Sequence, residues 1–326
     1  MPRLSIVVPV YNKDDYIDSS VKSILNQSFR DFELILVNDG STDHSGEKCD
    51  NFSRTDSRVR VIHQSNRGVS EARNTGVKAA TGSYIGFVDC DDELEIDMYE
   101  TLIDTALKHD SDITICGVRK FFPHKTEFSY GTQAVIIFNK EEAIRGLLRK
   151  DFARSVYDKI FRTEIAKKVL FEGRLNEDTF YNFQTIMEAK KVVFNDVLKY
   201  NYIIREDSAS MSQFSAKYFD IINFSRRMVE ICETHVQSAV RDAKYFDLVN
   251  NISLLNTMVI SGKNNIDKDY MLVYKNIMGY SSFISANPIK KKHRYAYVFL
   301  KINPKLYNFL MKLYCRIFDA DVSKKK

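Results

Sequence analysis

Short apolar runs alternate with amphipathic segments through the first 118 residues, and this alternation constrains the fold more than any other feature. The apolar runs lie at residues 4–10, 32–37, 59–63, 84–88 and 113–118. The segments between them carry apolar side chains at helical spacing, at residues 16–25, 46–52, 70–80 and 97–108. Continuous apolar runs are typical of strands buried on both faces. Strands that alternate with helices predict an α/β fold with a mostly parallel, Rossmann-like sheet.

The pattern loosens beyond that span. Helices are expected at residues 140–149 and 176–190, and strands at residues 191–205. The remainder of the chain is helical in pattern and contains few glycines. With 326 residues the chain is long enough to bury a sizeable core. We therefore predict two parts, an α/β domain at residues 1–212 and a mostly α-helical C-terminal region at residues 213–326.

The formal net charge of +5 is concentrated near the C-terminus. Residues 288–326 hold eleven Lys or Arg against two Asp, so this tail carries about +9 and the rest of the chain about −4. A nucleic-acid-binding domain typically carries a basic patch together with a recognition motif. No such motif accompanies the tail, so we expect no nucleic-acid partner.

Basic and aromatic side chains interleave through the tail, at about residues 289–326. This cationic, amphipathic pattern suits an anionic membrane surface. It also fits a helix that docks on the protein's own core and leaves its lysines in solvent. We favour the membrane interpretation, and the sequence leaves the second one open.

Cysteine usage indicates a reducing compartment. The chain has five cysteines, at positions Cys49, Cys90, Cys116, Cys232 and Cys315. Their odd number and the lack of a CxxC pair suit neither a zinc site nor a disulfide framework. Reduced thiols fit a cytoplasmic setting. No leader is expected, because the first apolar run is short and ends at Pro9, and no stretch approaches the roughly 20 apolar residues of a membrane span.

Polar and aromatic side chains follow the first two predicted strands. Tyr11 and Asn12 come directly after the first strand, and Asp39 ends the second. The carboxyl ends of parallel strands meet at one edge of the sheet, which is where such folds bind ligands. Tyr11 offers a flat face to a nucleobase, and ionised Asp39 could accept a hydrogen bond from an imino group such as that of uracil. Taken singly, each also fits an ordinary strand exit or an Asx turn.

An acidic cluster, Asp-Cys-Asp-Asp at residues 89–92, follows the fourth strand. Carboxylates gathered at a buried strand end are costly unless a positive charge compensates them. Asp89 and Asp91 could share a Mg²⁺ or Mn²⁺ ion that also binds a nucleotide diphosphate. Arg73 lies between Gly68 and Gly76, in a predicted turn and helix. Its planar guanidinium has a fork of N–H groups that suits a diphosphate. The alternatives are a solvated acidic turn and a solvated surface arginine.

A second acidic pair, Glu177-Asp178, opens the predicted helix at residues 176–190. Acids in the first turn commonly serve only to stabilise the helix start. The functional interpretation is a general base that deprotonates an acceptor hydroxyl.

The order and spacing of these motifs together resemble the family 2 glycosyltransferases of GT-A fold, of the bacterial capsule and cell-surface polysaccharide type. The motifs read Val-Pro-Val-Tyr-Asn, Asn-Asp-Gly-Ser-Thr-Asp, Ala-Arg-Asn-Thr-Gly, Phe-Val-Asp-Cys-Asp-Asp and Glu-Asp. The resemblance is close over residues 4 to about 117 and extends to about residue 211.

The resemblance implies a role for each matching position. It places Asp178 as the general base, and Asp89 and Asp91 as the metal-binding pair, with Asp91 the more direct ligand. The donor-binding residues that it implies are Pro9, Tyr11, Asn12, Asp39, Asn66, Arg73, Asp89, Asp91 and Arg205. One departure is Asn38, where many relatives have Asp. It weakens no assigned role, because Asp39 is the residue assigned to the nucleobase.

The implied reaction is inverting transfer of one sugar from a UDP-sugar to a hydroxyl of a glycan acceptor, with Mn²⁺ or Mg²⁺ as cofactor. A lipid-linked acceptor at the inner face of the cell membrane would fit the basic tail. A teichoic-acid or protein acceptor, and a non-catalytic nucleotide-sugar-binding scaffold, are the alternatives. The sequence specifies neither the donor sugar nor the linkage, and leaves open whether copies associate as a homo-oligomer.

Overall fold

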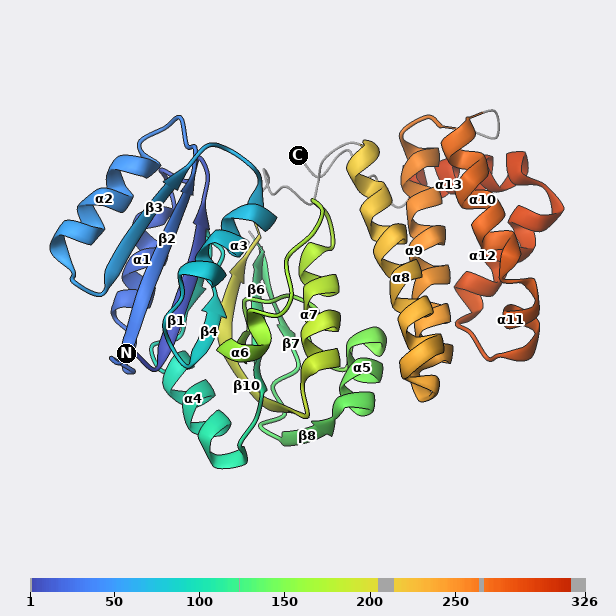
Figure 1. Ribbon diagram of the computed structural model, residues 1–326. Coiled ribbons are helices and arrows are strands. Elements are labelled where there is room, and N and C mark those ends of the chain that lie inside the picture. The colour runs from blue at the N-terminus through green and yellow to red at the C-terminus, as the bar shows by residue number, and fades with distance from the viewer. Residues whose placement is uncertain (1, 123, 205–213, 264–266, 318–326) are drawn as a thin grey trace. The chain divides into compact units, whose positions relative to one another are not determined.

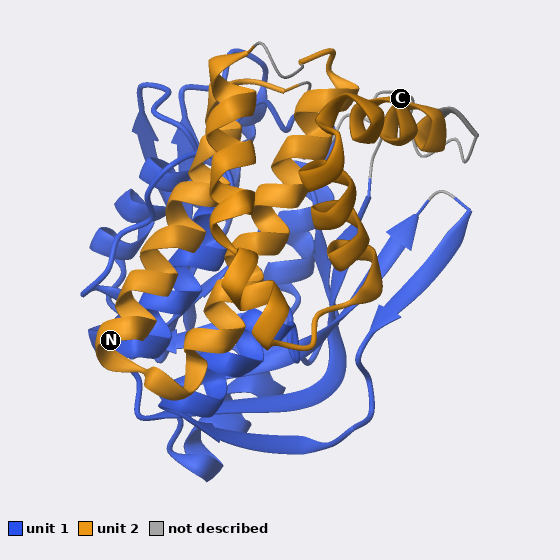
Figure 2. Ribbon diagram, turned by 90° about the vertical axis from the view of Figure 1, so that its right-hand side faces the viewer, with its two compact units in different colours: residues 1–204 blue, residues 205–326 orange. Residues whose placement is uncertain are grey.

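The computed structural model describes residues 2–122, 124–204, 214–263 and 267–317. The chain divides into two compact units, residues 1–204 and residues 205–326 (Figure 2). The boundary that we placed at residue 212 falls in the segment 205–213, which lies outside the described residues. Its position stays a prediction.

The N-terminal half of the first unit is a parallel sheet with alternating helices, as predicted (Figure 1). Its strands run in the order β3-β2-β1-β4, with bounds β1 (Leu4–Val10), β2 (Phe32–Asp39), β3 (Val59–Gln64) and β4 (Tyr84–Phe87). The helices are α1 (Ile17–Leu25), α2 (Ser45–Thr55), α3 (Val69–Ala79) and α4 (Met98–His109). All residues of β2 and β4 are buried, and β1 is buried except for partly buried Pro9. This burial explains why these strands are apolar on both faces.

Helices cover both faces of the sheet. On one face, Ile6 and Val8 of β1 share a core with Val21 of α1 and Leu102 of α4. On the other face α3 lies so close that a Cβ at Gly76 would sit 2.2 Å from a Val7 methyl group. Glycine is therefore required for this approach of helix to sheet.

The sheet becomes mixed beyond β4. Its full order is β3-β2-β1-β4-β9-β6-β10-β5, with β7 added to β6 and β8 added to β10. The additional strands are β5 (Glu93–Leu94), β6 (Ile113–Phe122), β7 (Lys125–Ser129), β8 (Val135–Asn139), β9 (Lys159–Arg162) and β10 (Lys191–Ile203). β10 runs parallel to β6, whereas β9 runs antiparallel to both β4 and β6. The helices of this half are α5 (Lys140–Arg149), α6 (Thr163–Ala166) and α7 (Glu177–Glu188).

The second unit is helical throughout its described residues and has a core of its own. Its α-helices are α8 (Phe219–His235), α9 (Val240–Ile260), α10 (Lys268–Gly279), α11 (Ser281–Ala286), α12 (Lys291–Ile302) and α13 (Pro304–Ile317). Two 3₁₀ turns accompany them, η2 (Ala216–Tyr218) and η3 (Gln237–Ala239). Leu255 of α9, Tyr270 of α10 and Leu300 of α12 are fully buried together. In the described part of the chain, we find no helix with the length and apolarity needed to cross a membrane.

Candidate active site

The loops that follow β1 and β2 are joined by hydrogen bonds around Asn12. The Asn12 backbone N–H donates to Ser41 Oγ at 3.1 Å, and Asn12 Oδ1 accepts from the Thr42 backbone N–H at 2.8 Å. Asn12 has a positive φ of 50°, a conformation that Asn tolerates better than most residues. This bend leaves Tyr11 46% exposed at the sheet edge, beside the end of β2. The predicted position Asn12 is thus tied to the loop that follows β2.

Asp39 organises the turn that leads into α3. Its carboxylate accepts from Gln64 Nε2 at 2.7 Å and from the backbone N–H groups of Arg67 and Gly68 at 2.9 and 2.8 Å. Gly68 has a φ of 89°, which favours glycine. A carboxylate has about four acceptor sites, so one is left for a ligand. The sequence did not reveal this structural use of Asp39, and its contact with a nucleobase stays a prediction, as does a donor contact of the exposed Asn66.

The acids that follow β4 have three different surroundings. Asp89 Oδ1 accepts from Arg73 Nη2 at 2.8 Å, and Asp91 Oδ2 accepts from Lys13 Nζ at 2.6 Å. Asp92 is fully buried and accepts from the Tyr200 hydroxyl at 2.7 Å and from the Ile203 backbone N–H at 2.9 Å. Asp89 and Asp91 are therefore each paired with a basic side chain, whereas Asp92 ties this segment to β10.

Burial governs the ionisation of this cluster. Removal from water raises the pKa of Asp92 to about 8, and the charge of Asp89 adds to the shift. Burial also raises the pKa of Asp89, although the neighbouring Arg73 opposes it. Cys90, between the acids, is 2% exposed and packs in the core.

Arg73 of α3 bridges the two acidic motifs. Its Nη1 donates to Glu177 Oε1 at 2.9 Å while Nη2 holds Asp89. The side chain is 5% exposed, and its guanidinium carbon lies 5.4 Å from the centre of the Phe171 ring. Burial opposes the charged form, but the charges of Asp89 and Glu177 outweigh it and raise the pKa of Arg73. The predicted diphosphate contact of Arg73 is untested, whereas its contacts with the two acids are direct.

Asp178 lies beside this bridge in the first turn of α7. Its Oδ1 accepts from the Thr179 backbone N–H at 2.7 Å. Burial and the charge of Glu177 raise the pKa of Asp178 to about 7, and Arg73 opposes the rise. A carboxylate with a pKa near neutrality can accept a proton from a hydroxyl during a reaction at that pH. The chemistry expected of Asp178 is thus compatible with its surroundings.

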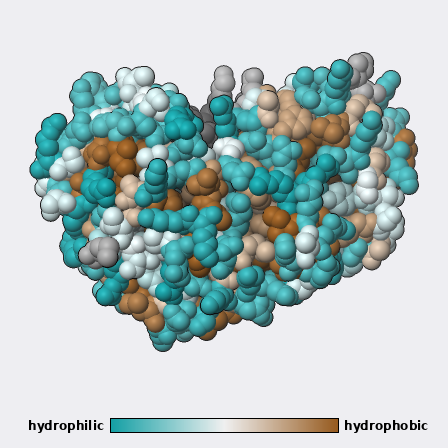
Figure 3. Space-filling view, viewed as in Figure 1, coloured by the Kyte–Doolittle hydropathy of each residue, from teal (hydrophilic) through white to brown (hydrophobic). Residues whose placement is uncertain are grey.

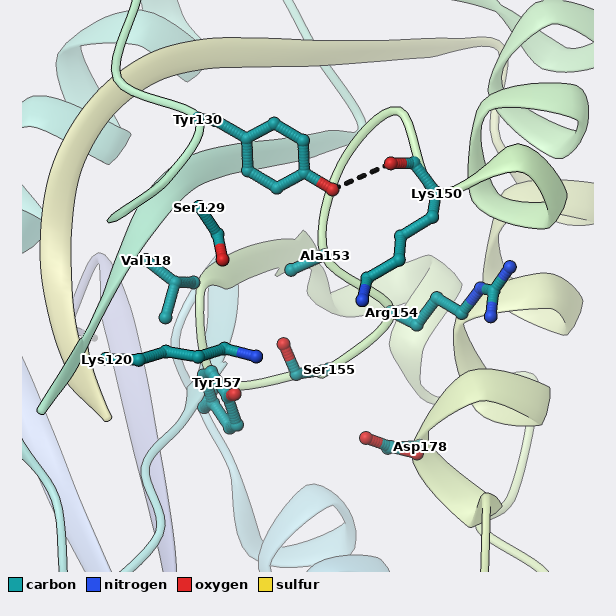
Figure 4. A pocket seen from close by; sticks show the side chains of 10 residues that line it. All are labelled: Val118, Lys120, Ser129, Tyr130, Lys150, Ala153, Arg154, Ser155, Tyr157 and Asp178. Atoms are coloured by element: carbon teal, nitrogen blue, oxygen red, sulfur yellow. Dashed lines mark hydrogen bonds between the residues drawn. The ribbon is translucent and has the colours of Figure 1, made fainter. Parts of the chain in front are cut away.

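A cavity of about 200 Å³ opens next to Asp178 (Figure 4). Residues of β6, the end of β7 and the segment 150–157 complete its lining. Tyr157 of this lining stacks on Tyr200 with ring centres 4.2 Å apart, and the Tyr200 hydroxyl donates to Asp92. The aromatic stack therefore connects the cavity wall to the acidic cluster.

Not every predicted residue can be placed, and some participants were missed. Pro9 is half-buried near the end of β1, whereas Arg205 lies outside the described residues. Lys13, Tyr157 and Tyr200 were not predicted. Lys13 follows the Val-Pro-Val-Tyr-Asn motif directly, which was an available signal. Tyr200 pairs with an acid 108 positions away, which no local pattern reveals.

The acidic pair fits a cation that is shared with a phosphate-bearing ligand. In the part of the chain that the structure describes, no three His, Cys, Asp or Glu side chains form a metal-binding group. Mg²⁺ needs only one or two carboxylates when substrate phosphates and water complete its shell. Asp91 and Asp89 can supply them, and Lys13 and Arg73 form ion pairs with these two carboxylates.

Comparisons with known proteins identify the family of the chain. The family model described as Glycosyl transferase family 2 matches residues 5–170, just over half of the chain. The uncharacterized glycosyltransferase EpsJ of Bacillus subtilis is 37% identical over 225 residues, which are 67% of this chain and 65% of EpsJ. The minor teichoic acid biosynthesis protein GgaB of the same bacterium is 26% identical over 90% of this chain and 36% of GgaB. The aligned part is thus less than two thirds of either relative.

The fold is shared with a solved structure, residues 1–349 of TarS from S. aureus in complex with UDP-GlcNAc. The two agree with a TM-score of 0.70 over 96% of this chain and 91% of that chain, at 20% sequence identity. This similarity shows a shared fold, a GT-A-like domain followed by a helical C-terminal region. Because the family description matches more than half of the chain, we conclude that the chain belongs to glycosyl transferase family 2.

Proposed function

We propose that this glycosyltransferase moves a single sugar from a UDP-sugar to a hydroxyl group of a glycan acceptor, with inversion at the anomeric carbon. One observation carries the proposal: the Arg73 bridge holds Glu177, and with it the neighbouring Asp178, next to Asp89 of the acidic cluster. Asp178, the proposed base, has a pKa of about 7 and would lie beside the carboxylates proposed to face the leaving diphosphate. The UDP-GlcNAc bound by TarS supports a uridine nucleotide as the donor's carrier.

The proposed reaction is a single displacement. The acceptor oxygen forms a bond to C1 of the donor sugar while the bond from C1 to the UDP oxygen breaks, and UDP leaves with the electron pair. The carboxylate of Asp178 takes the proton of the attacking hydroxyl. Because one displacement occurs and no covalent enzyme intermediate forms, an α-linked donor gives a β-linked product.

The donor nucleotide is proposed to bind along the carboxyl ends of β1 and β2. The exposed ring of Tyr11 would stack on the base, and the remaining acceptor site of Asp39 would take its imino N–H. Pro9, Asn12, Asn66, Arg73 and Arg205 complete the proposed donor-binding set. Asp89 and Asp91 would hold Mn²⁺ or Mg²⁺, which would offset the negative charge of the leaving diphosphate.

The acceptor and the cellular process are proposed from family membership. A lipid-linked glycan of capsular or cell-surface polysaccharide, assembled at the inner face of the cell membrane, is the preferred acceptor. A teichoic-acid acceptor is the second candidate, because GgaB aligns with 90% of this chain.

A UDP-release assay with a panel of UDP-glucose, UDP-galactose and UDP-N-acetylglucosamine tests the proposed activity. Run with Mn²⁺ or Mg²⁺, one donor should give UDP release well above the others, through hydrolysis or transfer. EDTA should remove this activity, and either metal added in excess should restore it, because the acidic pair would then lack the cation that supports UDP departure.

Two outcomes would contradict these assignments separately. Tight binding of every donor without turnover would indicate a scaffold subunit in place of an enzyme. Full activity in EDTA would remove the metal from the reaction and leave Lys13 and Arg73 as the charges beside the diphosphate.

The proposed membrane contact rests on helices α12 and α13. Apolar side chains are exposed on both, including Ile302 at 72% and Phe309 at 62%, while Tyr297, Leu300 and Tyr307 are buried on the side of the unit's core. Residues 288–317 contain eight Lys or Arg and no Asp or Glu. Exposed apolar side chains are interspersed with hydrophilic ones on the face drawn in Figure 3. A cationic surface with exposed apolar side chains favours anionic lipid as its occupant.

Point substitutions test this contact without removing core residues. The full chain with Ile302→Gln and Phe309→Gln should lose most of its binding to vesicles of equal parts phosphatidylglycerol and phosphatidylcholine, measured by co-sedimentation. Leu272→Gln, one such substitution at a 49% exposed site on α10, is the control and should bind as the wild type does. Unchanged binding by the double variant would rule the contact out. If the wild type is a dimer and the double variant is a monomer, the surface binds a second copy of the chain instead.

A further inference from the structure

The cavity beside Asp178 has a positively charged lining. Three basic side chains contribute to it: Lys120 of β6, Lys150 at the end of α5, and Arg154. Asp178 is the acid in the lining. Figure 4 shows the amino groups of Lys120 and Lys150 directed into the space between the labelled side chains, whereas the Arg154 guanidinium is directed away from it.

The two lysines lack an acidic partner among the described residues, although many other lysines of the first unit have one. Lys13 pairs with Asp91, and Lys48 with Asp14, whereas Lys120 and Lys150 form no ion pair in the described part of the chain. Burial together with the charges of Lys120 and Arg154 lowers the pKa of Lys150, so these cations repel one another. An anion bound between them would relieve that repulsion.

The chain holds these cations in place. Lys150 adopts a positive φ of 71°, and its backbone carbonyl accepts from the Tyr130 hydroxyl at 2.8 Å. Arg154 donates from Nε to the Leu147 carbonyl at 2.9 Å and from Nη2 to the Leu148 carbonyl at 2.6 Å. The loop that carries Lys150 and Arg154 is therefore fixed to the end of α5.

The cavity lies on the acceptor side of the proposed reaction. Its lining includes Asp178 but none of Tyr11, Asp39, Asp89 or Asp91, which we assign to the donor and its metal. In an inverting displacement the acceptor enters opposite the leaving group, and the base must contact the entering hydroxyl. A cavity that contains the base but not the nucleotide residues is the place for the acceptor.

We propose that this cavity binds an anionic phosphate group of the acceptor, close to the hydroxyl that receives the sugar. This inference rests on the proposed function, because it names the class of acceptor for the same site. Lysine ammonium groups bind phosphate as point charges, and the hydroxyl groups of Ser129 and Tyr157 lie in the same lining as further donors. The same cations would also suit a carboxylate on the donor sugar, and the experiment separates the two sources.

The test uses the full chain saturated with UDP, so that the donor site is filled, and glycerol 1-phosphate as a phosphate probe with a nearby hydroxyl. Binding is measured by calorimetry. The wild type should bind glycerol 1-phosphate and not glycerol. The double variant Lys120→Met/Lys150→Gln should weaken this binding about tenfold or more, because two charge-assisted contacts are lost. Its affinity for UDP should change less than about twofold.

Lys108→Met, which removes one positive charge at an exposed site on α4 outside this lining, is the control and should bind the probe as the wild type does. Retained probe binding in the double variant would overturn the proposal, as would displacement of the probe by UDP, which would place the phosphate in the donor site. A selective loss of UDP-glucuronic acid turnover, with glucose transfer intact, would assign the anion to the donor sugar and also overturn it. Absence of turnover with any donor would defeat the proposed function while leaving the binding result interpretable.

Discussion

Replacement of Asp178 by asparagine is expected to reduce sugar transfer by about 10²- to 10⁴-fold in kcat, the usual contribution of a general base. Asparagine has nearly the same shape but cannot accept the acceptor's proton. UDP affinity should persist, because Asp178 lies in the cavity lining away from the residues assigned to the nucleotide. The measurements are transfer with the donor selected by the panel and UDP binding by calorimetry. Asp104→Asn, at an exposed site on α4, is the control and should transfer normally.

The pH dependence gives this prediction a second readout. Burial raises the pKa of Asp178 to about 7, so the carboxylate is largely protonated below that pH and cannot act as a base. Wild-type kcat/KM should therefore rise with pH through about 7, and the residual activity of Asp178→Asn should lack that rise. Transfer near the wild-type rate by the variant, or an unchanged pH profile, would show the base assignment to be wrong.

The raised pKa of Asp178 also predicts that the stability of the fold falls with rising pH, whereas activity rises. The folded chain holds a proton on Asp178 between the ordinary carboxyl pKa of 3.8 and about 7, whereas the unfolded chain has released it. The contribution of Asp178 to the free energy of unfolding is therefore fully present below pH 3.8 and is lost as the pH rises from 3.8 to about 7. Asp178→Asn removes that loss, so the inactive variant should melt at a higher temperature than the wild type at pH 8.

Replacement of Arg73 by methionine is expected to lower the free energy of unfolding by about 3–5 kcal/mol at neutral pH, the usual effect of breaking a buried ion pair. Methionine fills a similar volume but leaves Asp89 and Glu177 facing each other without the positive charge between them. Transfer should fall as well, because the bridge positions α7 and its Asp178. The measurement is urea unfolding followed by circular dichroism, together with the transfer assay.

Two comparisons make the Arg73 prediction specific. Arg60→Met removes a half-exposed guanidinium from Glu33, to which Ser5 and Thr81 still donate, and should lower the free energy of unfolding less than Arg73→Met does. Glu177→Gln combined with Arg73→Met should be less destabilising than Arg73→Met alone, because one uncompensated carboxylate is gone. Equal stability of Arg73→Met and wild type would contradict the bridging role.

The local pattern of apolar residues was sufficient to predict the strands that are long and buried. Residues 4–10 and 32–37 are mostly apolar, interrupted by Ser5, Pro9 and Glu33, because β1 and β2 are covered on both faces. Their short length distinguishes them from helices. β5 was missed because two residues make no pattern, and β8 because Val135, Ile136 and Ile137 are largely exposed, so that no alternation marks a buried face. The segment 191–205, predicted as several strands, is one strand, β10, from Lys191 to Ile203 with two shifts in register.

The sequence by itself determined the alternation of strands and helices, and with it the edge where Tyr11, Asp39 and Asp89 would gather, because parallel strands bring their carboxyl ends to the same side. Only the tertiary structure decided how the charges are compensated. Arg73 and Glu177 are 104 positions apart, and Asp92 and Tyr200 are 108 apart. The pKa of Asp178 rises to about 7 because the packed chain buries it beside the charge of Glu177, and the distant Arg73 opposes the rise. The Glu-Asp motif supplies the neighbouring charge, but only the tertiary structure supplies the burial and the arginine.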